Sequence, residues 1–149
     1  MSVDQGNPAA LGPYGFGRFV KAASTAELEA LMDGARRTEV LDEVFRRMPE
    51  VFRADRAAGL RAVVHWSIGG RTDGGFDYYE LVIANGTCTV SPARIGTPQL
   101  TLRLGAVDFL RLVTGNVHAV LLIMRGRLRT AGELALTTKF PSLFDPPKV

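Results

Sequence analysis

The segment from Val107 to Phe144 constrains the fold most, because the period of its apolar residues changes within one short stretch. Apolar residues recur at helical spacing up to Val113, and the pair Gly115-Asn116 then interrupts them. A nearly unbroken apolar run (117–124), a short alternating segment (126–131) and an amphipathic stretch (133–144) follow. We therefore expect helices over 108–114, 117–124 and 133–144, and a strand over 126–131. Helices that frame a strand in this way can enclose an apolar cavity as readily as a solid core.

The residues before this segment predict two helices followed by four strands. Ser24 and Glu27 have the form of a capping box, so a helix should begin there, and helical spacing continues to Met48, just before Pro49. From residue 60 the apolar period becomes two, which predicts strands around 64–68, 79–83, 88–90 and 100–104. The dipeptides Asp73-Gly74 and Asn85-Gly86 between them are hairpin signals.

These elements have the order ααββββααβα, and only one face of each strand is apolar. The helices must then cover one side of the sheet. We predict an α+β fold in which a five-stranded, mostly antiparallel sheet is covered on one face by helices, as a single domain over residues 24–149. Residues 1–23 contain several Gly and Pro and no apolar period, which predicts a flexible N-terminal arm. Tyr14, Phe16 and Phe19 leave open that the arm docks on the body.

Composition narrows the function classes. The 149 residues, 46% hydrophobic and 22% charged, suit one globular domain. No run approaches the ~18–20 apolar residues of a membrane-spanning helix, and the N-terminus lacks a signal-peptide pattern. The single Cys88 excludes an internal disulfide, so we expect a cytoplasmic protein. The net charge is +3, and acidic residues are interspersed with basic ones. A protein that binds nucleic acid typically has a concentrated basic stripe, so we expect no nucleic-acid partner.

Residues that could carry chemistry are not grouped as catalysis requires. His65 and His118 lie far apart, and neither belongs to an i, i+4 ligand pair, so we expect no metal site. Cys88 lies in hairpin sequence without a neighbouring base, which indicates a small buried residue. The remaining candidates are turn glycines and solvated acids: Gly69-Gly70, Gly74-Gly75, Asp73, Asp77 and Asp42-Glu43. We therefore expect neither an enzyme nor a bound cofactor.

Several segments in order resemble the sterol carrier protein 2 (SCP2) domain family, in particular its stand-alone bacterial-type members. They are Val64–Ile68, YELVIANG, QLTLRL, DFLRLVTGN and MRGRLRTAGE. The last segment matches the family's order of aliphatic helix, glycine, basic-apolar-basic strand, glycine and acid, at Gly126, Arg127, Leu128, Arg129, Gly132 and Glu133. The resemblance extends from about Thr38 to Phe144.

The resemblance implies an apolar tunnel between sheet and helices, and non-enzymatic binding or transfer of a sterol, fatty acid, fatty acyl-CoA or isoprenoid lipid. Periodicity alone favours a solid core, whereas the resemblance favours the tunnel. The residues expected to line it are Trp66, Leu102, Phe109, Leu112, Leu121, Met124, Leu136, Phe140 and Phe144. Phe144 and the last helix would close its mouth.

Arg125, Arg127 and Arg129 alternate with smaller residues, which places three guanidinium groups on one face of the predicted fifth strand. They face water or contact a lipid head group or an anionic membrane. Two other functions stay open. One is an accessory protein that presents a lipid intermediate to a partner enzyme, as some relatives do in quinone synthesis. The other is a structural or dimerising module whose cavity is filled by its own side chains.

Overall fold

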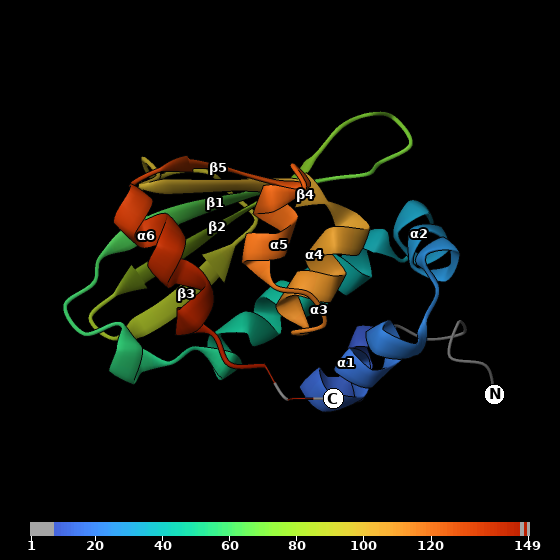
Figure 1. Cartoon of the computed structure of the whole chain (residues 1–149), viewed down its shortest axis with the longest axis horizontal. Helices are drawn as coiled ribbons and strands as arrows, with labels where there is room; N and C mark the ends of the chain where they lie inside the picture. The colour runs from blue at the N-terminus through green and yellow to red at the C-terminus, as the bar shows by residue number, and fades with distance from the viewer. Residues whose placement is uncertain (1–7, 147, 149) are drawn as a thin grey trace.

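The computed structural model describes residues 8–146 and 148 (Figure 1). In chain order the elements are η2 (Pro8–Leu11), α1 (Gly12–Ala22), α2 (Thr25–Asp33), α3 (Arg37–Arg47), η3 (Met48–Val51), η4 (Ala54–Arg56), β1 (Ala62–Gly69), β2 (Asp77–Ala84), β3 (Thr87–Ser91), β4 (Leu100–Gly105), α4 (Ala106–Val113), α5 (Ala119–Met124), β5 (Leu128–Gly132), α6 (Leu134–Lys139) and η5 (Phe140–Leu143). From α2 onward, their order agrees with the predicted order of helices and strands.

The five strands form one mixed sheet in the order β3-β2-β1-β4-β5. β1 pairs with β4 in parallel, and the other neighbours are antiparallel. Asn85 (φ 54°) and Gly86 (φ 73°) form the tight turn between β2 and β3, as their dipeptide predicts. The α+β class and the mostly antiparallel sheet are thus confirmed.

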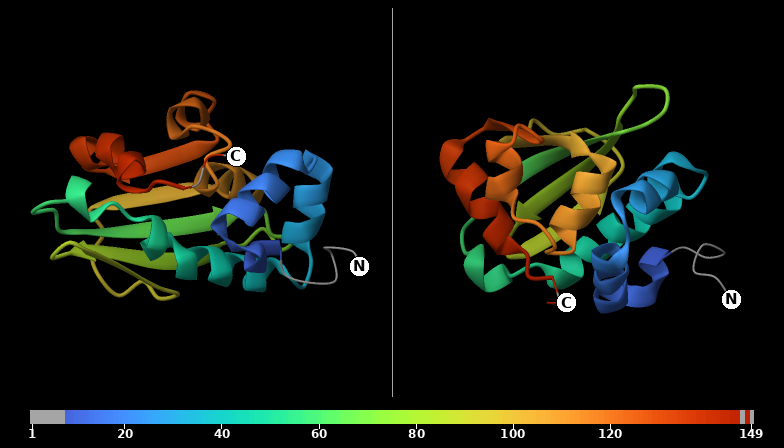
Figure 2. Two further views of the ribbon diagram at one scale, coloured as in Figure 1. Left: turned by 90° about the horizontal axis from the view of Figure 1, so that it is seen from below. Right: turned by 45° about the vertical axis from the view of Figure 1, so that its right-hand side comes forward.

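Helices from both ends of the chain cover the same face of the sheet. Trp66 of β1 lies on this face, and its ring centroid is 5.9 Å from that of Phe45 in α3, 5.3 Å from Phe109 in α4 and 6.0 Å from Phe140 in η5. Figure 1 shows α4, α5 and α6 in front of the sheet, and Figure 2 shows α1 and α2 at one end of it. The apolar faces of the strands are therefore buried against helices, as their alternation predicts.

A loop covers part of the opposite face of the sheet. His65 of β1 and Glu80 of β2 are cross-strand partners on this face, with 2.9 Å between Nε2 and Oε2. The Glu80 carboxylate also accepts hydrogen bonds from the backbone N–H groups of Ile95 and Gly96. These donors lower the pKa of Glu80, the His65 ring having the largest effect. The pair therefore tethers the connection between β3 and β4.

The N-terminal region differs from the expected arm, because residues 8–22 are helical. Phe16 and Val20, one helical turn apart, are buried against the body. Asn116 Nδ2 also donates a hydrogen bond to the carbonyl of Gly17 at 3.2 Å. The glycines of α1 obscured this apolar pair in the sequence pattern, since they lower helix propensity. The part of the predicted arm at residues 1–7 lies outside the described residues.

Two boundaries near the C-terminus also differ from prediction. The fifth strand begins at Leu128 rather than Gly126, because Gly126 (φ 69°) still belongs to the turn after α5. The last helix is shorter than 133–144 and continues as η5. Pro141 lacks an N–H donor, which explains why the helix tightens there.

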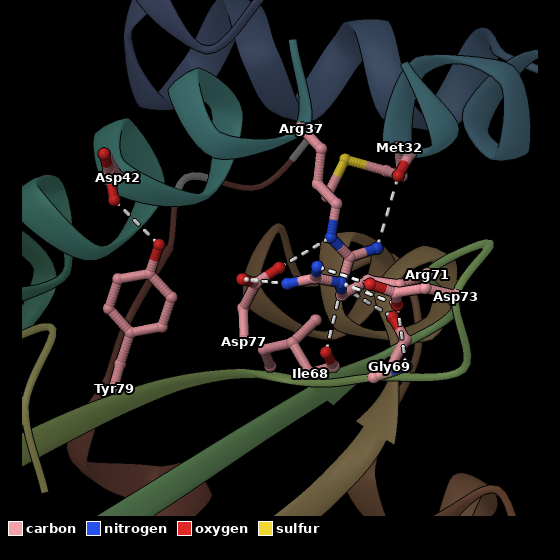
Figure 3. Close-up of polar contacts among 10 residues, drawn as sticks. Met32, Arg37, Asp42, Ile68, Gly69, Arg71, Asp73, Asp77 and Tyr79 are labelled. Atoms are coloured by element: carbon pink, nitrogen blue, oxygen red, sulfur yellow. Dashed lines mark hydrogen bonds and ion pairs between the residues drawn. The ribbon is translucent and has the colours of Figure 1, made fainter. Parts of the chain in front are cut away.

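A buried arginine fixes the junction between the helices and the sheet (Figure 3). Arg37, at the start of α3, donates to Asp77 Oδ2 at 2.7 Å, and to the backbone carbonyls of Ile68 (2.9 Å), Gly69 (2.8 Å) and Met32 (3.2 Å). The residue is only 7% exposed, so its charge depends on these acceptors. Arg37 thus joins α2 and α3 to the end of β1 and the start of β2.

Candidate functional site

An apolar cavity of about 360 Å³ lies between the sheet and the helices. The strands β1, β4 and β5 contribute Trp66, Leu102, Leu128 and Thr130 to its lining. The surrounding walls include Val44, Met48, Leu112, Val113, Ala119, Ile123, Phe140 and Phe144. The side chains that meet here come from strands, helices and the C-terminal segment, so tertiary structure alone creates the space.

Five of the nine residues predicted to line a tunnel border this cavity: Trp66, Leu102, Leu112, Phe140 and Phe144. The structure places the other four elsewhere. Phe109 is fully buried and stacks on Phe45, with 5.1 Å between ring centroids. Leu136 is buried outside the cavity lining. A role in ligand binding for the five lining residues is a prediction.

Leu121 and Met124 differ most from expectation, because both are exposed on α5. In this six-residue helix, Ala119 and Ile123 are the residues that line the cavity. Positions i and i+4 share a helical face, which turns Met124 outward. The uniformly apolar sequence of this helix gave no signal for which side faces the cavity.

Several lining residues were missed by the sequence analysis. Val44 and Met48 line the cavity, whereas Leu41 and Phe45 of the same helical pattern lie in the core. Their spacing predicted a buried face, but not its division between core and cavity. Phe16 of α1 also lines the cavity; from the sequence it was named only as one of three aromatic residues through which the N-terminal segment could dock on the body.

The cavity lining also includes polar and charged residues. Arg47, His118, Asp145 and Lys148 are among the lining residues, together with Gly12 and Gly115. The Arg47 guanidinium is held by Glu43, which also bonds Arg46. Hydrogen bonds from these two arginines lower the pKa of Glu43 to about 2. A mostly apolar lining with a few charged side chains suits a ligand with an apolar chain and a polar head.

The C-terminal segment closes one side of the cavity through backbone bonds. The N–H of Arg53 donates to the carbonyl of Leu143 at 2.7 Å, and the N–H of Asp145 donates to Val51 at 2.8 Å. Phe144 packs between Phe52, at 5.6 Å between ring centroids, and the Phe140 ring, at 5.2 Å. Phe144 is therefore anchored in the cavity lining, and its role in closing a mouth stays a prediction.

Most of the lining is apolar, and its groups offer no chemistry of the catalytic kind. Trp66 keeps its buried Nε1 without a hydrogen-bond partner among the described residues. Cys88 lies outside the lining, and burial raises the pKa of its thiol to about 12, so it is a poor nucleophile. In residues 8–146 and 148, no group of three His, Cys, Asp or Glu side chains could hold a metal ion.

The three arginines were expected to share one face of the fifth strand, but the structure does not place them so. Arg125 caps the end of α5, and Arg127 precedes β5, where its Nε donates to Asp108 Oδ2 at 2.9 Å. Only Arg129 lies within β5, opposite Arg103 of β4. The glycine turn at residue 126 separates Arg125 from the strand. None of the helices that the structure describes is long and apolar enough to cross a membrane.

Comparisons with solved structures show the same fold in other proteins. The sec-alkylsulfatase Pisa1 from Pseudomonas sp. is 18% identical, with a TM-score of 0.62, and the match covers 76% of this chain but only 17% of Pisa1. Sterol carrier protein 2 from Yarrowia lipolytica, in its apo form, is 18% identical over 76% of this chain and 94% of its own, with a TM-score of 0.58.

The ubiquinone synthesis protein UbiJ-SCP2 is 15% identical over 72% of this chain and 94% of its own, with a TM-score of 0.54. No curated protein matches the chain. The sequence does match the model of the SCP-2 sterol transfer family over residues 41–145, which is more than half of its length. The chain therefore belongs to the SCP-2 sterol transfer family.

Proposed function

We propose that the protein binds a lipid or another apolar small molecule in its cavity and carries it without catalysing a reaction. The observation behind this proposal is the apolar space of about 360 Å³ that the protein's own side chains leave unfilled. Each buried methylene of a lipid chain contributes roughly 0.8 kcal/mol, so about ten would supply ~8 kcal/mol before ordering costs. That energy suffices for micromolar binding with broad selectivity among sterols, fatty acids, fatty acyl-CoA and isoprenoid lipids.

The same space argues against a purely structural module with a self-filled cavity. A second candidate function is an accessory protein that presents a lipid intermediate to a partner enzyme. The likeness to UbiJ-SCP2, a ubiquinone synthesis protein, favours this candidate. Co-purification of a specific enzyme with the full-length chain would support the accessory role over free carriage.

The proposal includes a cytoplasmic location and a transient contact with anionic membranes. Arg127 contributes less to such a contact than its position in the sequence suggested, because Asp108 partly neutralises it. Arg125 and Arg129 are exposed and retain that role in the proposal. Replacing all three arginines with Gln should weaken association with anionic liposomes at low salt, and unchanged association would contradict the contact.

Lipid binding can be tested on the purified protein by native mass spectrometry, followed by solvent extraction of any retained lipid. A fluorescent fatty acid can then be titrated, with Trp66, the only tryptophan, as energy donor. Saturable energy transfer is expected, because Trp66 lies in the cavity lining. Absence of both a retained lipid and a saturable titration would contradict the proposed function.

A matched pair of variants locates the binding site. Ala119→Phe adds a ring to the cavity wall and should lower fatty-acid affinity at least about tenfold, because it occupies the space that the chain would fill. Ile95→Phe adds a ring to the exposed loop on the opposite face of the sheet and should leave affinity unchanged. Equal affinities of the two variants would place the ligand outside the cavity.

A further inference from the structure

The helix α5 exposes more large apolar side chains than any other helix in the described part of the chain. Four of its six residues form what we term the α5 apolar surface: Val120 (66% exposed), Leu121 (38%), Ile123 (39%) and Met124 (79%). Only Ala119 and Leu122 of this helix are buried. Single exposed hydrophobic residues are ordinary, but four contiguous ones mark an interaction surface.

This surface lies beside the cavity. Ala119 and Ile123 contribute to the cavity wall, while Val120 and Met124 are the most exposed residues of the same helix. Figure 1 shows α5 in front of the sheet next to α4, with no helix packed over it in this view. One short helix therefore separates the apolar interior from the surroundings.

The chain segment that contains α5 is basic, although Arg127 pairs with Asp108 of α4. From Asn116 to Gly132 the sequence contains three arginines and no Asp or Glu. Arg125 follows the helix directly and is exposed. A second copy of the chain, related by two-fold symmetry, would bring the arginines of both copies together at such a contact. An anionic lipid surface has the complementary charge and can also bury the apolar side chains.

We propose that the α5 apolar surface docks on an anionic bilayer, with Val120 and Met124 entering the boundary of the acyl chains and Arg125 meeting the lipid phosphates. The inference rests on the proposed function, because the docked helix would place the cavity wall against the bilayer from which a lipid is taken. Basic residues beside exposed apolar ones are typical of helices that bind at the membrane interface.

Flotation with vesicles tests this docking surface on the full-length protein. The probe is vesicles of phosphatidylcholine containing phosphatidylglycerol, compared with vesicles of phosphatidylcholine alone. The wild type should bind the anionic vesicles more tightly, and V120S/M124S should lower that binding about tenfold or more. The matched control Ile95→Ser removes a residue that is 85% exposed on the opposite face of the sheet, and it should bind as the wild type does.

A fluorescent label gives a second readout that does not depend on affinity. An environment-sensitive maleimide is attached to M124C and, as control, to I95C. The native Cys88 is buried with a raised thiol pKa, so it should react slowly. Anionic vesicles should shift the emission of the label at position 124 to the blue and leave that at position 95 unchanged.

Three results would overturn the docking proposal: V120S/M124S binding vesicles like the wild type, equal emission shifts at both labelled positions, or a wild-type dimer that V120S/M124S dissociates. The fatty-acid titration in vesicle-free solution separates this failure from that of the proposed function. A protein that takes up the fatty acid in solution but does not bind vesicles would refute docking alone. A protein that binds vesicles but takes up no fatty acid would refute the carrier function on which the inference rests.

Discussion

Two parts of the layer between the helices and the sheet have similar apolar residues but differ in packing. Under α3 and α4, the ring of Phe45 stacks on Tyr79 at 3.9 Å and on Phe109 at 5.1 Å between centroids. Around α5, the C-terminal ends of α3 and α4 and the C-terminal segment, the cavity of about 360 Å³ remains. The contrast indicates that the stacked rings close the layer where they meet, and that the side chains around α5 leave it open.

The largest expected effect on stability comes from the closed part of the layer, which is the ring stack of Tyr79, Phe45 and Phe109. Phe109→Ala should lower the free energy of unfolding by about 3–5 kcal/mol, because it removes a fully buried ring from a stack. Leu112→Ala, in the cavity wall, should lower it by only about 1–2 kcal/mol, since that side chain already borders empty space. Urea denaturation of both variants measures the difference, and equal losses would show that the two parts are packed alike.

The second effect concerns the junction that holds the closed part in place. Arg37→Met should lower the free energy of unfolding by about 3 kcal/mol, because Asp77 Oδ2 and three backbone carbonyls lose this donor, while Asp77 keeps its pair with Arg71. Arg36→Met, which removes a more exposed pair with Glu39, should change it by less than about 1 kcal/mol. The same denaturation series serves as the measurement, and similar values for the neighbouring arginines would count against a structural role for Arg37.

The third effect is the stabilisation that a fatty acid bound in the cavity, the open part of the layer, should give. It depends on the proposed lipid binding. A fatty acid at about 100 times its Kd should raise the free energy of unfolding by about 2.7 kcal/mol in the wild type. Phe109→Ala should retain much of this gain, because Phe109 lies outside the cavity lining. Ala119→Phe should lose most of it. Thermal unfolding with and without the fatty acid measures the gain, and a full gain in Ala119→Phe would place the ligand elsewhere.

The sequence predicted the closed part better than the open part. The capping box at Ser24 and Glu27 is formed, with both of its hydrogen bonds. The alternation at Val64, Trp66 and Ile68 correctly predicted the face buried against helices. Such features depend on local spacing and backbone geometry, which the sequence displays directly.

The cavity depends on distances between elements, which local patterns do not encode. Leu121 and Ile123 are equally apolar in the sequence, yet only Ile123 lines the cavity. Phe109 was expected to line a tunnel, but it stacks on Phe45. Phe45 belongs to a separate helix, α3, so the local pattern around Phe109 does not indicate this contact. The buried contacts of Arg37 join residues up to 40 positions apart, and no motif marks them.

The smallest effect lies at the C-terminal end of α3, where Arg47 lines the cavity. Arg46 and Arg47 lower the pKa of Glu43 from 4.5 to about 2 in the folded protein. The unfolded chain therefore binds this proton first as the pH falls, so the stabilisation is fully present above about pH 4.5 and disappears towards pH 2. Glu43→Gln should lower the free energy of unfolding by about 1 kcal/mol at pH 7.

That difference should vanish near pH 2, where the carboxyl of the wild type is also losing its charge. Denaturant titrations of both proteins between neutral and acidic pH measure it, with the neutral-pH difference as the internal reference. Because Glu43 holds Arg47 in the cavity lining, the substitution also frees a cation next to the proposed binding site. A difference that persists unchanged at pH 2 would mean that Glu43 stabilises α3 through the packing of its side chain. The ion pairs with Arg46 and Arg47 would then contribute nothing measurable to stability.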